Sequence, residues 1–161
     1  MRRLILMRHA EAERSSGLGD FARELTEAGR LDAALVGRAL ARAGWAPDLA
    51  VVSSAKRAMQ TWEAAAPAFP DAPVEYARDI YETSAAGLAQ LAHEAEGRAG
   101  TLLLIGHNPS LYLYASQLAG GSRGAAELRD GLPPSAAALF EFEGGRPRFE
   151  RLLKAKDLGG G

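Results

Sequence analysis

The sequence predicts a single α/β domain, a three-layer sandwich in which a mostly parallel central sheet is flanked by helices. Short apolar runs alternate with longer segments of helical periodicity along the chain. The apolar residues in these runs are consecutive, which is typical of parallel strands buried on both faces. A length of 161 residues suits one domain with its own core. We expect this domain to span residues 1–158 and residues 159–161 to form a frayed tail.

The first third of the chain contains two expected strands and a helix between them. Residues 2–8 hold the first apolar run, and residues 49–54, "LAVVSS", hold the second. Thr26 is expected to cap a helix that continues to about Ala43, with Gly44 as its stop. The apolar residues at helical spacing in this segment are Leu31, Leu35, Ala39 and Leu40.

The middle of the chain continues the alternation of helices and strands. Residues 56–66 are expected to be helical, with Met59, Trp62 and Ala66 on one face, and Pro67 ends the helix. A short strand is expected over residues 74–76. Ser84 can then cap a further helix, in which one face is shared by Leu88, Leu91, Ala92 and Ala95.

A third continuous apolar run, "TLLLI" at residues 101–105, is followed directly by "GHNPS". Asn108 as the cap and Pro109 at the first helical position predict a helix through about Leu118. Residues 119–124 are expected to form a loop. Residues 135–143 and 146–154 are separated by Gly144 and Gly145, which predicts a hairpin or an edge pair of strands.

Composition excludes several classes of function. The net charge of −1 gives no overall field toward nucleic acid or anionic lipid, so we expect neither as a partner. No run approaches the ~20 apolar residues of a membrane span, and the cytoplasm is the expected location. The absence of cysteine excludes disulfides, thiolate metal sites and thiol nucleophiles. His93, inside an expected helix, is assigned a structural or solvated role, and Trp45 and Trp62 are assigned to packing.

Three of the apolar runs end in reactive or basic side chains. The first ends at Arg8 and His9, the second leads through Ser53 to Arg57, and the third ends just before His107. Ligands of open α/β sheets bind beyond the carboxyl ends of the strands, so we expect these groups to converge. Arginine side chains and the free N–H groups of a helix N-terminus both suit phosphate oxygens. The sequence therefore predicts a pocket for a phosphoryl group.

Histidine is the best remaining candidate for a nucleophile in such a pocket. The chain contains no "GxxxxGK[ST]" nucleotide cradle, no cysteine and no pair of aspartates arranged for magnesium. An imidazole whose other nitrogen is held by a backbone carbonyl can attack phosphorus and later be released by water. His9 must be neutral for this attack, and flanking arginines would disfavour its imidazolium form.

The pattern of motifs is similar to that of a known family. "LILMRHAEAE", "VVSSAKRAMQTWEAA" and "LLLIGHNPSLYLYASQLAG" resemble the histidine phosphatase superfamily, and within it the small phosphohistidine phosphatases of the SixA type. The resemblance runs from the first strand to about residue 120. It implies a compact α/β domain of the phosphoglycerate mutase-like fold, no metal or cofactor, and catalysis through a phosphohistidine intermediate.

The resemblance also implies roles for individual residues. His9 would be the nucleophile, Arg8 and Arg57 would bind the phosphoryl oxygens, and His107 would donate a further hydrogen bond to the transferring group. Ser53 matches a family serine near the pocket. Asn108, beside His107, joins these residues as a candidate for substrate binding.

Two departures from the family pattern concern the subfamily and the proton donor. The larger family usually has glycine where Ala10 stands, and alanine there is common in the small phosphohistidine-type members. Relatives that cleave phosphate esters often use a mid-chain acid, for which Glu82 in "IYETSAAGL" is the candidate; the alternative is an exposed residue before a helix cap. A phosphohistidine substrate would need this acid less. Glu11 and Glu13 are assigned to the pocket rim.

The leading hypothesis is thus a metal-independent phosphatase that acts on phosphohistidine in a protein partner, such as a phosphotransfer domain. The second hypothesis is a phosphatase or mutase for small phosphate esters. A third is a phosphoryl-binding regulatory module without turnover.

Overall fold

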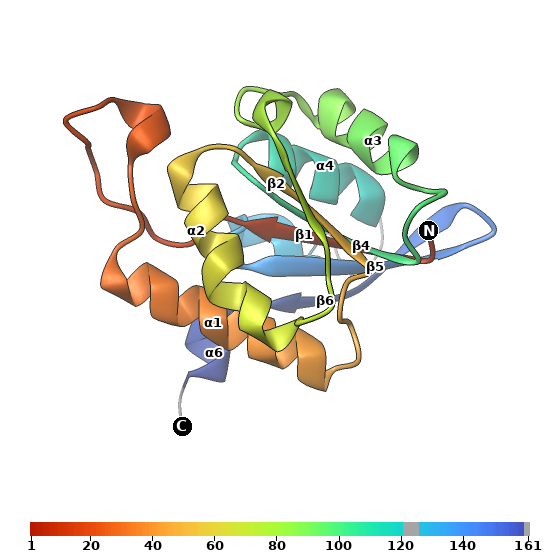
Figure 1. The fold of residues 1–161 in the computed structure, drawn as a ribbon. Coiled ribbons are helices and arrows are strands. Elements are labelled where there is room, and N and C mark those ends of the chain that lie inside the picture. The colour runs from red at the N-terminus through yellow and green to blue at the C-terminus, as the bar shows by residue number, and fades with distance from the viewer. Residues whose placement is uncertain (121–125, 160–161) are drawn as a thin grey trace.

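The computed structural model, which describes residues 1–120 and 126–159, contains a six-stranded sheet in the order β3-β2-β4-β1-β5-β6 (Figure 1). Strands β1 to β4 are mutually parallel, and the antiparallel hairpin β5–β6 extends the sheet beside β1. The strands are β1 (Arg3–Arg8), β2 (Leu49–Ser53), β3 (Val74–Ala77), β4 (Thr101–Gly106), β5 (Ala137–Glu143) and β6 (Arg146–Leu153). The predicted mostly parallel sheet is confirmed.

Helices cover both faces of this sheet, as Figure 1 shows. The two faces bury separate apolar clusters, one against α1 and α2 and the other against α3 and α4. The helices are α1 (Glu27–Arg42), α2 (Lys56–Ala65), α3 (Ala85–Glu94), α4 (Ser110–Ala119) and α6 (Ala155–Leu158). The three-layer α/β architecture is therefore confirmed.

The first strand explains how a run of consecutive apolar residues serves two layers. Successive side chains of a strand point to opposite faces of the sheet. Leu4 and Leu6 accordingly pack in the cluster beneath α3 and α4, whereas Ile5 and Met7 pack in the cluster beneath α1 and α2. All four side chains are fully buried. β1 is thus packed on both faces, and it forms a rigid support for the residues at its carboxyl end.

Two of the predicted helix caps are confirmed. The side chain of Thr26 accepts a hydrogen bond from the backbone N–H of Gly29, and that of Ser84 accepts one from Gly87. The face of α1 that spacing suggested is only partly buried: Leu40 is inaccessible, but Leu31 is 66% exposed. The buried residues of α1 are instead Gly29, Ala33, Val36, Gly37 and Leu40.

Small residues turn this other face of α1 inward because they allow close backbone approach. A Cβ atom on Gly37 would lie 2.9 Å from the carbonyl oxygen of Ala65 in α2, and one on Gly29 would lie 2.2 Å from the carbonyl oxygen of Glu11. Helix α1 therefore packs directly on α2 and on the segment that follows β1. Close packing at these glycines therefore decides which face of α1 is buried, although apolar spacing favours a face that includes Leu31.

The predicted face of α2 is also only partly correct. Trp62 is buried, whereas Met59 and Ala66 are half-buried. The buried side includes three polar residues, Arg57, Gln60 and Thr61. These side chains face inward because they hydrogen-bond to the segments that carry the candidate site.

The prediction that Asn108 caps the helix after β4 is wrong. The N-cap of α4 is Pro109, and no side chain caps this helix. The amide of Asn108 instead donates to the carbonyl oxygen of Leu132, 3.1 Å away. A partner on a distant loop has thus replaced the local cap that the sequence suggested.

The C-terminal hairpin is confirmed, with Gly144 and Gly145 at φ angles of 58° and 81° in its turn. Arg148 pairs with Glu141, Glu143 and Glu150, which agrees with a solvated strand. The predicted loop at 119–124 and the predicted tail at 159–161 lie largely outside the described residues. Across the described ranges, the structure contains no helix with the length and apolar character needed to cross a membrane.

Candidate active site

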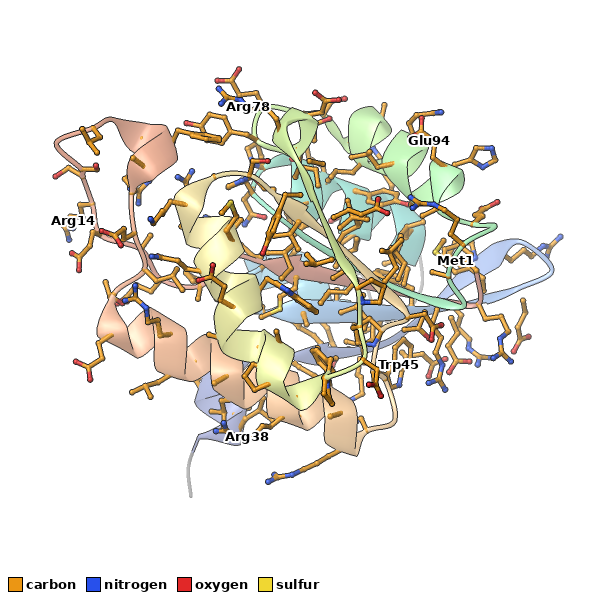
Figure 2. The ribbon with its side chains drawn as sticks, viewed as in Figure 1. Met1, Arg14, Arg38, Trp45, Arg78 and Glu94 are labelled. Carbon is orange, nitrogen blue, oxygen red and sulfur yellow. The ribbon has the colours of Figure 1, made fainter. Side chains whose placement is uncertain are left out.

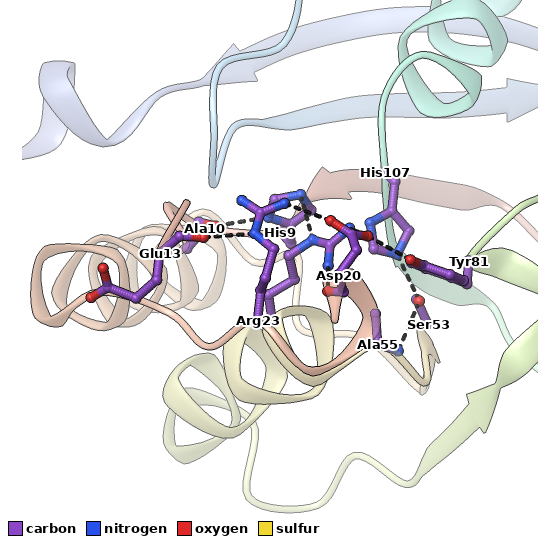
Figure 3. A network of polar contacts seen from close by, with 10 residues as sticks. His9, Ala10, Glu13, Asp20, Arg23, Ser53, Ala55, Tyr81 and His107 are labelled. Atoms are coloured by element: carbon purple, nitrogen blue, oxygen red, sulfur yellow. Dashed lines mark hydrogen bonds and ion pairs between the residues drawn. The ribbon is translucent and has the colours of Figure 1, made fainter. Parts of the chain in front are cut away.

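His9 follows the last residue of β1, and its ring is fixed by two different kinds of partner. Its Nδ1 atom lies 2.8 Å from the carbonyl oxygen of Ala10, and its Nε2 atom lies 3.4 Å from Nε of Arg57 (Figure 3). A carbonyl oxygen can only accept a hydrogen bond, and an arginine Nε–H can only donate one. These partners together assign the proton to Nδ1 and leave a lone pair on Nε2.

Burial keeps this imidazole neutral. The pKa of His9 is lowered to about 3, chiefly because burial penalises the charged form. The hydrogen bond to Ala10 opposes this shift, while electrostatic interactions with His107, Arg57 and Arg8 add to it. The expected contribution of the flanking arginines is present, but loss of solvation is the larger cause.

Arg57 approaches His9 from the first turn of α2, where it is 6% exposed. Thr61, one turn further on, donates its hydroxyl to the carbonyl oxygen of Arg57 at 2.7 Å and accepts the backbone N–H of Ala10 at 2.9 Å. This hydroxyl therefore ties α2 to the residue that follows His9. The sequence analysis did not identify Thr61, although its i+4 spacing from Arg57 was available as a signal.

Arg8 is held from the opposite side by a loop. Its Nη1 atom donates to the carbonyl oxygen of Leu132 at 3.0 Å, the same oxygen that accepts from Asn108. Its Nε atom is buried and has no hydrogen-bond partner among the described residues. Burial, followed by the charge of Arg57, lowers the pKa of Arg8. The guanidinium therefore retains one donor that no described residue uses.

His107 follows β4 and lies beside His9, with 5.2 Å between the ring centroids. Its Nε2 atom lies 2.7 Å from the hydroxyl of Ser53, which also accepts the backbone N–H of Ala55 (Figure 3). Its Nδ1 atom is buried and unpartnered within the described part of the chain. Burial, and then the charge of Arg57, lowers the pKa of His107 to about 4, although Asp20 opposes this shift.

Asp20 and Tyr81 complete the site, and the sequence analysis identified neither. One carboxylate oxygen of Asp20 accepts from Arg57 Nη2 at 3.2 Å and from the hydroxyl of Tyr81. The ring of Tyr81 also packs edge-on against His107, with centroids 5.6 Å apart. Asp20 begins one short 3-10 turn and Tyr81 follows another, so no periodic pattern marked either residue.

The remaining candidates lie further out. Glu82 is exposed and lines a surface hollow with Arg78, Asp79, Tyr81 and Thr83. Glu11 and Glu13 line a separate hollow that contains none of Arg8, His9, Arg57 and His107. His93 is exposed and pairs with Glu96, and both tryptophans are buried. Within the described residues, His, Asp and Glu side chains form no group of three or more suited to a metal ion.

The residues predicted at the three strand ends therefore converge. Arg8, His9, Ser53, Arg57 and His107 surround one location, in which Arg8 Nε and His107 Nδ1 are unpartnered. Two guanidinium groups beside two neutral imidazoles form an environment suited to an anion with several oxygens. The Nε2 lone pair of His9 faces this environment.

Comparisons with known sequences agree with this arrangement. The family model of the histidine phosphatase superfamily (branch 1) matches residues 4–99, more than half of the chain. An uncharacterized protein of Mycobacterium tuberculosis is 30% identical over 142 residues, which cover 86% of this chain and 88% of the relative. An uncharacterized chloroplast protein of Arabidopsis thaliana is 32% identical over 133 residues, or 75% of this chain. The chain spans 61% of the length of the Arabidopsis protein.

Comparisons with solved structures extend the match to nearly the whole fold. A candidate phosphohistidine phosphatase SixA from Agrobacterium tumefaciens has a TM-score of 0.87 and 29% identity, covering 94% of this chain and 97% of that one. The protein histidine phosphatase SixA complexed with tungstate shares the fold, with a TM-score of 0.81, 21% identity and coverage of 97% and 99%. The chain therefore belongs to branch 1 of the histidine phosphatase superfamily and has the fold of its SixA-type members.

Proposed function

We propose that this protein is a metal-independent phosphatase that removes the phosphoryl group from phosphohistidine on a protein partner. His9 is the nucleophile and carries the phosphoryl group as a covalent intermediate. The observation that carries this proposal is the placement of the His9 ring, whose Nε2 lone pair is directed at Arg57 by the bond from Nδ1 to Ala10.

Three neighbouring side chains supply the charge and the donors that the reaction requires. Arg57 and Arg8 bind the phosphoryl oxygens, and the unpartnered Nε of Arg8 is one donor available for this. The Nδ1 atom of His107 is the second available donor when the Ser53 hydroxyl donates to Nε2. Donors that are already in place stabilise the charge that develops on the transferring phosphoryl group.

The reaction proceeds in two displacements. The Nε2 lone pair of His9 attacks phosphorus, the P–N bond of the substrate breaks, and the leaving imidazole takes up a proton from solvent. Water then attacks the phosphorus bound to His9, the bond between phosphorus and Nε2 breaks, and inorganic phosphate leaves. His9 returns to its neutral form, which burial favours.

The carboxylate that contacts Arg57 supports a substrate with a good leaving group. Asp20 accepts hydrogen bonds from Tyr81, Arg23 and Arg57, which lower its pKa and keep it ionised. An ionised carboxylate cannot protonate a leaving alkoxide. An imidazole leaves more readily than an alkoxide, so phosphohistidine fits this site better than a simple ester. The name of the Agrobacterium structure supports the same substrate class.

Hydrolysis of small phosphate esters is the second candidate function. The same fold occurs in a phosphoserine phosphatase from Entamoeba histolytica solved with 3-phosphoglyceric acid, at 18% identity and a TM-score of 0.71. An ester substrate would require an acid, and Glu82 would have to reach the leaving oxygen from its exposed position. Loss of ester turnover in Glu82→Gln would favour this function.

The proposal is tested with a phosphotransfer domain that carries ³²P on histidine, incubated with the protein in the presence of a chelator. Wild-type protein is expected to release phosphate, whereas His9→Ala is not. His93→Ala is the matched control, because this exposed histidine on α3 lies 3.5 Å from Glu96, away from the site. Equal release by wild type and His9→Ala would refute the nucleophile assignment.

Trapping the intermediate separates an enzyme from a binding module. Rapid quenching of wild-type protein is expected to yield phosphate that is acid-labile, base-stable and bound to the peptide containing His9. A regulatory module without turnover would bind phosphorylated partner and yield no labelled protein.

A further inference from the structure

Two nitrogens of Arg57 already donate to Asp20, and one of these bonds goes to its carboxylate. Arg57 Nη2 donates to a carboxylate oxygen of Asp20 at 3.2 Å, and Nη1 donates to the backbone oxygen of Asp20 at 2.8 Å. Figure 3 shows the Asp20 carboxylate beside His9, His107 and Tyr81. The carboxylate oxygen on Nη2 occupies a donor that also suits a phosphoryl oxygen.

The Asp20 carboxylate and a phosphoryl group on His9 would compete for the same donors. Arg57 Nε lies 3.4 Å from His9 Nε2, the atom to which phosphorus would be attached. Oxygens on that phosphorus would lie against the same guanidinium. Two negative groups this close repel each other, so Asp20 and the phosphoryl group weaken each other's bonds to Arg57.

The two partners in this ion pair differ in how easily they can leave it. The side chain of Arg57 is 8% exposed, whereas that of Asp20 is 53% exposed. A buried guanidinium requires an anionic partner, because an unpaired buried charge is costly. An exposed carboxylate can return to water with little penalty. The exchange of Asp20 for a phosphoryl group therefore keeps Arg57 neutralised throughout.

The loop that carries Asp20, residues 13–24, lies outside the two apolar clusters of the core, and its Phe21 packs edge-on against Tyr81 with 4.7 Å between ring centroids. Its base is fixed by the bridge between Ala12 and Leu25. Asp20 lies in a 3-10 turn, residues 20–22, that contains no buried residue, and Gly19 precedes it at a φ of 96°. Arg23 also donates to the other carboxylate oxygen of Asp20 at 2.9 Å. Asp20 thus retains a partner on its own loop when it leaves Arg57.

We propose that Asp20 is an internal anion that competes with the phosphoryl group for Arg57 and thereby sets the affinity of the site for phosphate. This inference rests on the proposed function, because it assumes that Arg57 binds the phosphoryl group. Asp20 returns to Arg57 after hydrolysis and favours the release of inorganic phosphate. Only a phosphoryl group that also bonds to His9 or to further donors displaces it effectively.

The test measures the binding of inorganic phosphate to the intact protein by isothermal titration calorimetry. Asp20→Asn retains the size of the side chain and removes its charge. This variant is expected to bind phosphate about tenfold more tightly than wild type, because the interaction between residue 20 and Arg57 that competes with phosphate is weakened. Phosphate should inhibit turnover by this variant more strongly by a similar factor. A structural defect would not increase affinity.

Two controls locate the effect. Asp79→Asn removes the same charge from an exposed neighbouring position, and it should change phosphate affinity by less than about twofold, as expected of a charge screened by solvent. In an Arg57→Gln background, Asp20→Asn should no longer tighten binding, because the donors under competition are gone. A gain that persists without Arg57, or a gain equal to that of Asp79→Asn, would overturn the inference.

Unchanged or weaker phosphate binding by Asp20→Asn would also overturn it and would assign Asp20 to the positioning of Arg57. The result is distinguishable from failure of the proposed function, which is measured by phosphohistidine turnover. Tighter phosphate binding without any turnover would support competition by Asp20 and refute the phosphatase. Normal turnover with unchanged phosphate affinity would refute the competition alone.

Discussion

The Nε atom of Arg57 donates to the Nε2 atom of His9 across a distance of 3.4 Å, and the other two nitrogens of the guanidinium are bound to Asp20. One side chain thus contacts both the candidate nucleophile and an anion. This double role depends on the planar fork of arginine, in which donors point in fixed and different directions.

Replacement of Arg57 by lysine should therefore be severe, although it preserves the charge. A single ammonium cannot occupy both positions, so we expect kcat/KM for a phosphohistidine substrate to fall by about 100-fold, typical of losing a donor to the developing charge. Steady-state kinetics would measure the loss. Arg38→Lys on the outer face of α1, labelled in Figure 2, should retain full activity. Near-normal kcat/KM in Arg57→Lys would show that charge alone suffices.

The hydroxyl of Ser53 should contribute to stability through His107. Ser53→Ala leaves the buried Nε2 atom of His107 without its 2.7 Å partner. An unsatisfied buried polar group costs about 1–3 kcal/mol, so the free energy of unfolding should decrease by this amount in urea denaturation. Ser54→Ala, one residue along the chain and half-buried, is the matched control, with an expected change within about 0.5 kcal/mol. Equal losses in the two variants would argue against a role for this hydrogen bond.

The fold was predictable because burial on both faces leaves a strong local signal. Consecutive apolar residues marked β1, β2 and β4, and the strand-end rule of α/β sheets then brought Arg8, His9 and His107 together. Asp20 lacked such a signal, since its role depends on contacts with Arg57 and Tyr81 that are 37 and 61 residues away in the sequence. The Asn108 side chain likewise has a non-local partner, since Leu132 is 24 residues away in the sequence.

The orientation of α1 shows a second reason why apolar spacing alone does not predict the buried face of a helix. Apolar spacing placed Leu31 with Leu40, yet Leu31 is exposed and Leu40 is inaccessible. The glycines of α1 decide the orientation through close backbone contacts, which hydrophobic periodicity does not register. We expect Leu31→Ser to change the free energy of unfolding by less than about 0.5 kcal/mol and Leu40→Ala to lower it by about 2–5 kcal/mol. Urea denaturation of both variants measures the difference, and similar losses would contradict the observed face.

Gly29 tests the close contact itself. Alanine favours a helix by about 1 kcal/mol over glycine, but a Cβ atom here would meet the backbone oxygen of Glu11 at 2.2 Å. We expect the steric clash to outweigh the gain in helix propensity, so that the free energy of unfolding falls by about 1–3 kcal/mol in urea denaturation. Gly97→Ala is a suitable control, because nothing lies within 4 Å of its Cβ position. An unchanged free energy of unfolding in Gly29→Ala would mean that the backbone around Glu11 shifts at little cost to make room for the Cβ atom.

The lowered histidine pKa values predict how stability varies with pH. In the folded protein the pKa values of His9 and His107 are about 3 and about 4, below the ordinary value of 6.5. Between these values and pH 6.5, the unfolded chain binds protons that the folded chain does not. The two histidines therefore make the free energy of unfolding fall as pH decreases from 6.5 toward 4, by up to about 1.4 kcal/mol per pH unit for each histidine.

Urea denaturation at pH 7 and pH 5 measures this dependence. Wild-type protein should lose more stability between the two values than His107→Asn, in which one of the two depressed groups has been removed. His93→Gln should behave as wild type, because its side chain is 73% exposed and the site is untouched. Comparing variants cancels the titration of carboxylates such as Asp20, which all three proteins share. An identical loss in wild type and His107→Asn would show that burial of His107 does not control its protonation.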